Sequence, residues 1–208
     1  MMKLTKIKSK FCNTGFYRYF WSAVMHPKNF IFLSKYPFWK CYNVWTRKFS
    51  GYQYTMYNWI SNGWRKAFGP ALTMDIVEAL EKDNIPKRKW TENLQWQDIK
   101  QKYGTLRLYA STTKRVQDVL YKYETASMCY CESCGKPARY VTHGWISYLC
   151  EDCFNAGVAK YGDTGDRLSA DYIPNFYSYD DDGNETKYTA LERWGIDFVK
   201  MWGLEETK

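Results

Sequence analysis

Histidines and long apolar runs are scarce in this sequence, which excludes two classes of function, and carboxylates are absent from its first 74 residues. The 208 residues include two histidines, His26 and His143, so histidine-rich metal sites and histidine-based triads have little to draw on. No Asp or Glu precedes Asp75. The longest apolar run, residues 16–25, is interrupted by Arg18 and is far shorter than the ~20 residues of a bilayer-spanning helix. No secretory signal is recognisable in the sequence.

Catalytic sequence motifs are also missing. The chain contains no G-x-S-x-G or H-E-x-x-H motif, and no glycine-rich phosphate loop precedes Lys136. We interpret Asp98 and Glu132 as isolated surface charges rather than general bases. The acidic turn around Gly183 is similar to a calcium loop, but Thr189 would occupy the twelfth position, where Glu is required. We therefore predict that the protein is not an enzyme.

Aromatic residues, in contrast, are abundant. The chain has 10 Trp, 19 Tyr and 11 Phe, which together make 19% of all residues. Hydrophobic residues reach 45% and charged residues 25%, as in ordinary globular proteins, so disorder of the whole chain is excluded. A chain of this length forms one large domain or two small ones and buries enough surface to fold without disulfides. The core should be built largely from amphipathic rings.

The net charge of +8 is distributed as a gradient along the chain. Residues 1–66, which we call the basic segment, carry 12 Lys and Arg and no acid, whereas residues 163–208 carry 5 basic and 11 acidic residues. A segment of this charge should generate a positive potential that attracts polyanions, an anionic membrane or an acidic protein. Alternatively, the acidic end of the chain folds back onto the basic segment and cancels much of this potential.

Hydrophobic periodicity predicts a mixture of helices and hairpins. Met56, Ile60, Trp64 and Phe68 recur every four residues and predict a helix over residues 53–68, which Gly69-Pro70 should end. A period of two predicts a hairpin between residues 90 and 111 that turns near Tyr103-Gly104. The other expected elements are helices at 16–25 and 28–35, an amphipathic helix through 72–80, a helix capped by Thr113 with Val116, Val119, Leu120 and Tyr123 on its inner face, a hairpin across 177–189 and a final helix over 191–202.

These elements predict an α+β fold in which helices pack against antiparallel hairpins to form a single compact unit. Changes in composition along the chain suggest four regions. We expect a basic aromatic N-terminal extension (1–55), an α+β core (56–128), a zinc module (129–161) and an acidic C-terminal hairpin and helix (162–208).

The most specific motif is a pair of C-x2-C sequences. Cys131 and Cys134 are followed after fifteen residues by Cys150 and Cys153, the pattern of a four-cysteine zinc site. The odd total of seven cysteines and their tight pairing favour metal in a reducing cytosol over a disulfide framework. A knuckle at the first pair, a hairpin around His143-Gly144 and a helix from the second pair follow the order of a treble-clef zinc finger. The alternative is four buried thiols without metal.

A zinc ion held here should be structural. Four thiolates close the tetrahedral shell, whereas a catalytic zinc keeps one position open for water. Pro precedes neither pair, as the zinc deaminase pattern would require. His143 could replace one ligand, although a histidine at a hairpin tip is more often simply exposed. Cys129 offers a second possible first pair with Cys134, but its x4 spacing does not match, so we expect it to be a buried bystander.

Several motifs together resemble one protein family. They are Gly63-Trp64, the segment IKQKYGTLRLY at 99–109, the segment CESCGKP at 131–137 and the segment GWISYLC at 144–150. This string, which spans residues 60–155, is similar to a widespread family of small phage and prophage proteins with a K-E-K-[FY]-G-T-L-R strand before a four-cysteine zinc knuckle. The resemblance implies a viral origin and a host-cell cytoplasmic setting, and it implies no particular reaction. Residues 1–55 and the acidic end lie outside it.

Cations and rings alternate along the basic segment. This alternation is typical of nucleic-acid surfaces, where cations contact phosphates and rings stack on bases. The alternative is that most of these rings belong to the core. As anion-binding residues we predict Lys28, Lys35, Lys40, Arg47, Lys48, Arg65 and Lys66, and as stacking residues Trp21, Tyr36, Trp39 and Trp45.

The sequence thus predicts a zinc-containing phage accessory protein that binds nucleic acid or a nucleotide-type anion. An inhibitor that grips a host defence or transcription protein is the main alternative. Binding to a membrane surface is the third hypothesis, because Trp and Lys also suit lipid interfaces.

Overall fold

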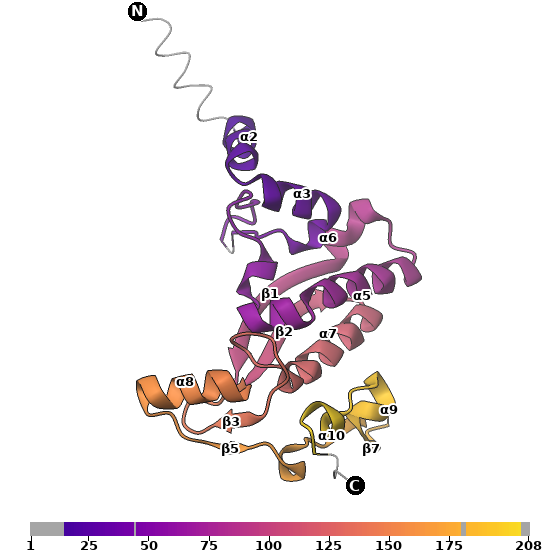
Figure 1. The fold of residues 1–208 in the computed structure, drawn as a ribbon. Coiled ribbons are helices and arrows are strands. Elements are labelled where there is room, and N and C mark those ends of the chain that lie inside the picture. Colours follow the sequence, from indigo (N-terminus) through magenta and orange to yellow (C-terminus); the bar gives the residue numbers. More distant parts are fainter. Residues whose placement is uncertain (1–14, 44, 180–181, 205–208) are drawn as a thin grey trace, which may run out of the picture.

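Helices and antiparallel strands alternate in the computed structural model, which describes residues 15–43, 45–179 and 182–204 (Figure 1). The predicted α+β class is confirmed, with helices beside a two-stranded hairpin at the centre and smaller sheets at one end. The short elements not discussed further are η3 (Lys87–Lys89), α6 (Trp90–Asn93), η4 (Ser127–Cys129) and η5 (Ala170–Tyr172). Within the described ranges no helix has the length and apolarity needed to cross a membrane.

The central hairpin joins β1 (Leu94–Lys102) to β2 (Thr105–Thr112). Tyr103 and Gly104 form its turn with φ of 52° and 78°, the left-handed pair that tight two-residue hairpins require. The predicted turn is therefore confirmed. Alternation along the strands buries one face of the hairpin, which supplies Ile99, Leu106 and Leu108 to the core.

Two helices cover the buried face of this hairpin. They are α5 (Gly69–Lys82) and α7 (Lys114–Ala126), which also pack against each other (Figure 1). The predicted cap of α7 is present, since the Thr113 hydroxyl accepts a hydrogen bond from the Val116 amide at 3.3 Å. The carboxylate of Glu124 on α7 accepts from the Leu108 amide at 2.6 Å, so α7 also satisfies part of the open edge of β2.

The helix predicted over residues 53–68 is wrong. In its place lie a single turn, η2 (Met56–Trp59), and a short helix, α4 (Asn62–Ala67), with extended backbone at Ile60. The side chain of Asn58 accepts hydrogen bonds from the amide and hydroxyl of Thr55, which closes the first turn on itself. The four-residue repeat arises because Ile60, Trp64 and Phe68 are buried in one core and Met56 packs against it, although no continuous helix joins them.

The described part of the basic segment begins with two helices, as predicted. They are α2 (Gly15–Met25) and α3 (Pro27–Lys35), followed by the turn η1 (Pro37–Trp39). Leu33, Phe38 and Trp39 enter the same core as α5 and α7. This core therefore contains residues from both sides of the boundary suggested at residue 55.

A second core joins the cysteine region to the acidic end of the chain. Met128, Val141 and Tyr148 pack there with Phe198 and Trp202. The helices and strands in this part of the chain are β3 (Tyr140–Thr142), β4 (Tyr148–Leu149), β5 (Gly165–Arg167), β6 (Phe176–Tyr179), β7 (Glu185–Tyr188), α9 (Ala190–Trp194) and α10 (Phe198–Met201). The predicted hairpin across 177–189 is present as β6 and β7, whereas β5, which pairs with β3, was not predicted.

The single final helix predicted over residues 191–202 is wrong. Gly195, with φ of 68°, ends α9 in the left-handed conformation, and α10 restarts at Phe198 after a side-chain cap from Asp197. These two short helices lie at the opposite end of the molecule from α2 and α3 (Figure 1). In the described residues, the acidic end therefore does not fold back onto those helices.

Candidate metal centre

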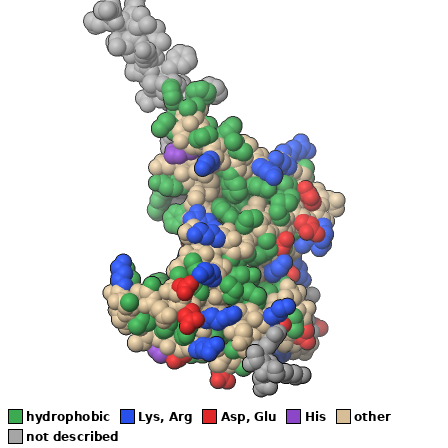
Figure 2. All heavy atoms as spheres, in the orientation of Figure 1, with side chains coloured by type: hydrophobic (Ala, Val, Ile, Leu, Met, Phe, Trp, Pro, Cys, Tyr) green, Lys and Arg blue, Asp and Glu red, His purple; other side chains and the backbone are tan. Residues whose placement is uncertain are grey.

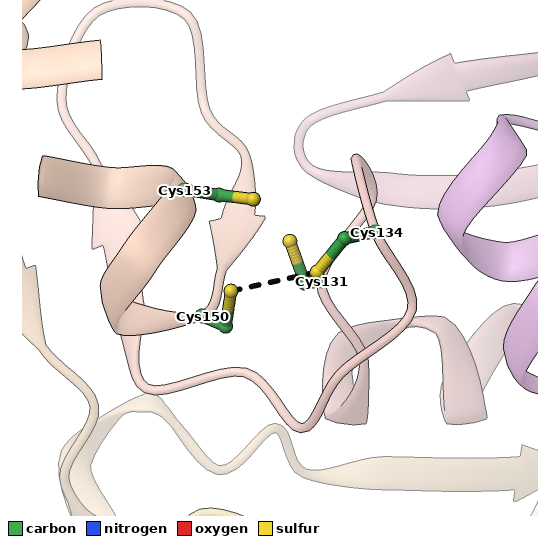
Figure 3. Close-up of side chains that lie close together, drawn as sticks. All are labelled: Cys131, Cys134, Cys150 and Cys153. Carbon is green, nitrogen blue, oxygen red and sulfur yellow. Dashed lines mark hydrogen bonds between the residues drawn. The ribbon is translucent and has the colours of Figure 1, made fainter. Parts of the chain in front are cut away.

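The four predicted ligands come together in space. The sulfur atoms of Cys131, Cys134, Cys150 and Cys153 all lie within 4.8 Å of one another and face a common centre (Figure 3). A tetrahedral zinc–thiolate site with bonds of about 2.3 Å places its sulfur atoms roughly 3.8 Å apart, so the cluster has the correct dimensions. These four cysteines could hold a metal ion.

The first pair lies in a tight knuckle of the backbone. The Gly135 amide donates to the Cys131 carbonyl at 2.9 Å, and the Cys131 amide donates to the Lys136 carbonyl at 2.7 Å. Gly135 has φ of 87°, a conformation that favours glycine, so the residue after the second cysteine is needed for this turn. The knuckle aims both sulfur atoms toward the second pair.

The second pair lies at the start of a helix. Cys150 is the N-terminal cap of α8 (Glu151–Tyr161), and Cys153 follows within the first turn. The β3–β4 hairpin precedes α8 and connects it to the knuckle. The order of knuckle, hairpin and helix is thus as predicted, and the helix N-terminus adds a favourable field for negatively charged sulfur.

Protons and metal compete for this cluster. Burial is the main cause that raises the pKa of the Cys150 and Cys153 thiols, and the nearby Cys131 sulfur also raises it. Because a metal binds thiolates, metal uptake releases protons and should weaken as the pH falls. The cluster is partly shielded from solvent, since Cys131 and Cys150 are buried, while Cys134 and Cys153 are half-buried.

Two nearby groups stay outside the described cluster. Cys129 is buried in the second core, and burial raises the pKa of its thiol to about 12, as suits an inert apolar side chain. His143 is exposed at the hairpin tip, where its Nε2 lies 2.7 Å from the Asp166 carboxylate.

The knuckle docks tightly on α4. The Gly63 amide donates to the Glu132 carbonyl at 2.8 Å, and a Cβ at Gly63 would lie 2.2 Å from the Cys131 carbonyl oxygen. Next to this contact, the Trp64 indole is fully buried and donates to the Ser127 carbonyl at 3.0 Å. The Gly63-Trp64 pair therefore connects the cysteine cluster to the first core.

Glu132 also belongs to this contact, which corrects its interpretation as a surface charge. Its carboxylate accepts hydrogen bonds from Ser61 at 2.9 Å and Ser147 at 3.2 Å, and so bridges α4 to the β3–β4 hairpin. Burial raises the pKa of Glu132, and the two hydroxyl donors oppose this shift. Sequence spacing gives no signal for this role, because Ser61 and Ser147 are far apart in the chain.

The predicted anion-binding residues are spread over three parts of the basic segment. Lys28 and Lys35 lie on α3, Arg65 and Lys66 lie on α4, and the other three lie between η1 and η2 (Lys40, Arg47, Lys48). None of the seven forms an ion pair within the described part of the chain. Arg65 and Lys40 are half-buried, and the remaining five are exposed.

The predicted stacking rings divide into two groups. Trp39 is fully buried and stacks on Trp96 with centroids 4.8 Å apart, so its assignment as a platform for bases is wrong. Tyr36 is half-buried against the first core. Trp45 is 91% exposed and Trp21 is 46% exposed, so these two rings are accessible.

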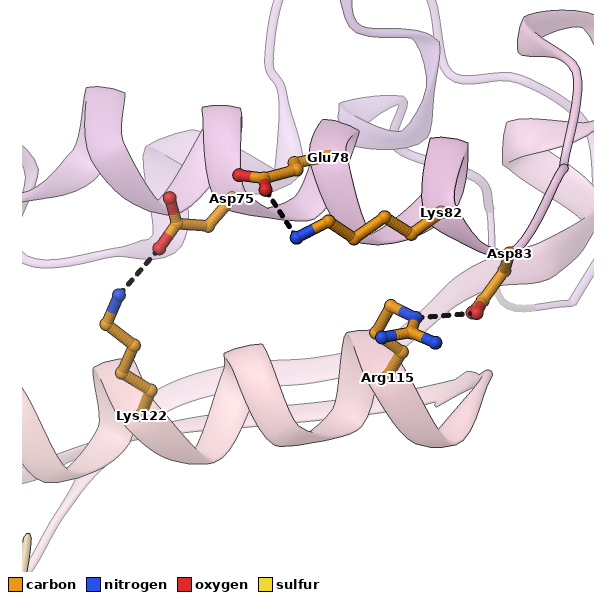
Figure 4. A network of polar contacts seen from close by, with 6 residues as sticks. All are labelled: Asp75, Glu78, Lys82, Asp83, Arg115 and Lys122. Carbon is orange, nitrogen blue, oxygen red and sulfur yellow. Dashed lines mark hydrogen bonds and ion pairs between the residues drawn. The ribbon is translucent and has the colours of Figure 1, made fainter. Parts of the chain in front are cut away.

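Charges in the groove between α5 and α7 are paired, unlike the described cations of the basic segment. In the groove between α5 and α7, Lys122 binds Asp75 at 2.8 Å, Lys82 binds Glu78 at 2.6 Å, and Arg115 binds Asp83 at 2.8 Å (Figure 4). Hydrogen bonds from Thr113 and then Arg115 hold the pKa of Asp83 below its ordinary value. This groove neutralises its own charges, so its cations are less available to an anion than those of the basic segment.

Fold and site together define an α+β protein with a four-cysteine cluster that could hold a metal ion. In comparisons with known proteins, no family model matches the chain, and neither a curated protein nor a solved structure does.

Proposed function

We propose that this protein is a non-enzymatic phage accessory protein that binds nucleic acid through its basic segment, with zinc as a structural ion in a treble-clef module. The metal part of this proposal is supported by the four-thiolate donor set, which leaves no position for a catalytic water. A zinc ion held by Cys131, Cys134, Cys150 and Cys153 would fix the knuckle against α4. The chain's own residues would then present the binding surface.

The observation that carries the binding proposal is the turn between η1 and η2. The Asn43 side chain accepts from the amides of Trp45 and Thr46 at 3.0 and 2.8 Å, which shapes the turn. Trp45 projects with 91% exposure, and two exposed cations, Arg47 and Lys48, follow it. An exposed ring beside unpaired cations suits a base stacked next to its phosphates.

The absence of carboxylates strengthens this site. No Asp or Glu precedes Asp75 in the sequence, so the basic segment contributes no acidic side chain to the surface around the turn. Phosphate contacts release condensed counterions, and each contact contributes a slope of roughly −0.7 to −0.9 to the dependence of log K on log salt. Binding by this segment should therefore weaken steeply as salt is added.

The test is a salt titration of oligonucleotide binding by fluorescence anisotropy, with a matched pair of variants. R47E/K48E should weaken binding and reduce the salt slope by roughly 1.5, because two phosphate contacts are lost. K87E/R88E makes the same charge change at two exposed residues of η3, and it should leave the affinity and the salt slope nearly unchanged. Equal effects of the two variants, or no binding by the wild type, would contradict the proposal.

A further inference from the structure

The helices α2 and α3 expose an apolar surface that binding to nucleic acid does not require. Its members are Phe20, Trp21, Val24, Met25, Phe30 and Ile31, with exposed fractions from 42% to 70%. We call this set the α2–α3 face. Figure 2 shows hydrophobic side chains gathered at the end of the molecule that these helices form. A cluster of this kind on a surface marks an interaction site.

The opposite side of α2 attaches it to the molecule. The Tyr19 hydroxyl donates to the Phe49 carbonyl at 3.0 Å, and the Ser22 hydroxyl accepts from the Tyr52 amide at 2.8 Å. A Cβ at Gly51 would lie 2.9 Å from the Ser22 oxygen, so the helix sits close against this loop. The helix is therefore held by one side, and the α2–α3 face points outward.

Positive charge lies beside the α3 part of this face. Lys28 and Lys35 are exposed and lie three residues before and four residues after Ile31, which places all three along one side of α3. Neither lysine forms an ion pair with a described residue. The sequence of residues 1–35 contains no Asp or Glu, so no acid of this segment offsets the two lysines.

This combination selects one kind of partner. Phosphates bind cations and bases stack on rings, so neither accounts for three exposed aliphatic side chains, Val24, Met25 and Ile31. A second copy of the chain would bring together two faces that carry lysines but no acid to pair with them, because α2 and α3 contain no Asp or Glu. An anionic lipid surface accepts both groups, because aliphatic and aromatic side chains enter the headgroup boundary while lysines meet lipid phosphates.

We infer that the α2–α3 face binds an anionic lipid surface, lying in the interface without spanning the bilayer. This site goes beyond the proposed nucleic-acid function, because it uses the apolar side of α2 and α3 rather than the turn at Trp45. Apolar burial and electrostatic attraction would both contribute, so binding should need anionic lipid and should weaken, without vanishing, in high salt.

Vesicle co-sedimentation of the full chain tests this inference. The protein should sediment with vesicles of phosphatidylcholine mixed with phosphatidylglycerol, and much less with phosphatidylcholine alone. V24S/I31S should lower partitioning about tenfold, because two exposed apolar side chains are lost. M74S removes an apolar side chain of similar exposure from α5, at 52%, and should partition like the wild type. The single variant M25S, at the most exposed position of the face, should reduce binding without affecting the fold.

Three results would overturn the inference. They are a wild type that stays in the supernatant, an equal loss in M74S, and a dimer in sedimentation velocity that V24S/I31S dissociates, which would assign the face to a second copy. Oligonucleotide affinity distinguishes this lipid site from the proposed nucleic-acid site, since V24S/I31S should bind oligonucleotide as tightly as the wild type. A protein that binds vesicles but no oligonucleotide would contradict the nucleic-acid proposal and leave the lipid site intact.

Discussion

The cysteine region and the basic segment differ in how much of their chemistry the residue types determine. Four cysteines in two C-x2-C pairs are compatible with few kinds of site, and the structure brings all four sulfur atoms within 4.8 Å of one another. Tryptophans and lysines have many uses, and the structure divides them between core and surface. Trp39 is fully buried, while Trp45, six residues later, is 91% exposed. Spacing therefore predicts a metal site more sharply than composition predicts a binding surface.

The two regions also differ in their contacts with the rest of the molecule. The knuckle is enclosed by α4, with Gly63 and Glu132 in direct backbone contact. The basic segment exposes α2, α3 and the turn at Trp45. A substitution in the cysteine region should therefore lower the stability of the fold. A substitution in the exposed turn should instead weaken oligonucleotide binding and leave stability nearly unaltered.

The largest effect is expected for Cys134→Ser. Removing one thiolate should lower metal content well below half an equivalent and destabilise the module by several kcal/mol, because binding energy at a structural site is folding energy. Metal analysis of freshly reduced protein, together with thermal unfolding, measures both.

The matched control for this variant is Cys129→Ala. Cys129 lies just outside the cluster, so the substitution should keep the metal and cost at most about 1 kcal/mol of unfolding free energy. If Cys129→Ala loses the metal while Cys131→Ser keeps it, the ligand assignment is wrong.

A pair of tryptophan variants sharpens the comparison within the basic segment. Trp39→Ala should cost about 4 kcal/mol of unfolding free energy, because it leaves a cavity beside Trp96 and removes a 3.2 Å hydrogen bond to Thr73. Trp45→Ala should change stability by less than about 0.5 kcal/mol and weaken oligonucleotide binding by ~1–3 kcal/mol. Chemical denaturation and anisotropy separate the two. A loss of oligonucleotide binding in Trp39→Ala, with a loss of stability in Trp45→Ala, would contradict this assignment of the two rings.

Gly63→Ala tests the contact between knuckle and core, with an expected cost of about 2–3 kcal/mol. The new Cβ would lie 2.2 Å from the Cys131 carbonyl oxygen, and backbone on both sides leaves little room for relaxation. Lys66→Ala, on the exposed side of the same helix, should be nearly neutral. The cost of Gly63→Ala should shrink when a chelator removes the metal, and an unchanged cost would show that the knuckle stays docked without it.

Local signals in the sequence predicted much of the fold. The apolar stripe of α5, the Thr113 cap of α7 and the Tyr103-Gly104 turn each depend on neighbouring residues, and each is present. The helix over residues 53–68 failed because Asn58 closes a separate turn onto Thr55, and such side-chain competition leaves the four-residue repeat intact.

Long-range contacts account for what the sequence did not predict. The strand β5 is three residues long and exists by pairing with β3, so no periodicity marks it. Glu132 is held by Ser61 and Ser147, which approach only after folding. The burial of Trp39 depends likewise on Trp96 and Thr73 from other elements.

The central claim is that the cysteine region holds a closed, structural zinc site. X-ray absorption at the zinc edge of the purified protein tests it most directly. The account predicts one zinc per chain with four sulfur neighbours at about 2.3 Å and no oxygen or nitrogen ligand. A zinc with three sulfurs and one oxygen would contradict the account, because an open position for water is what catalysis at zinc requires.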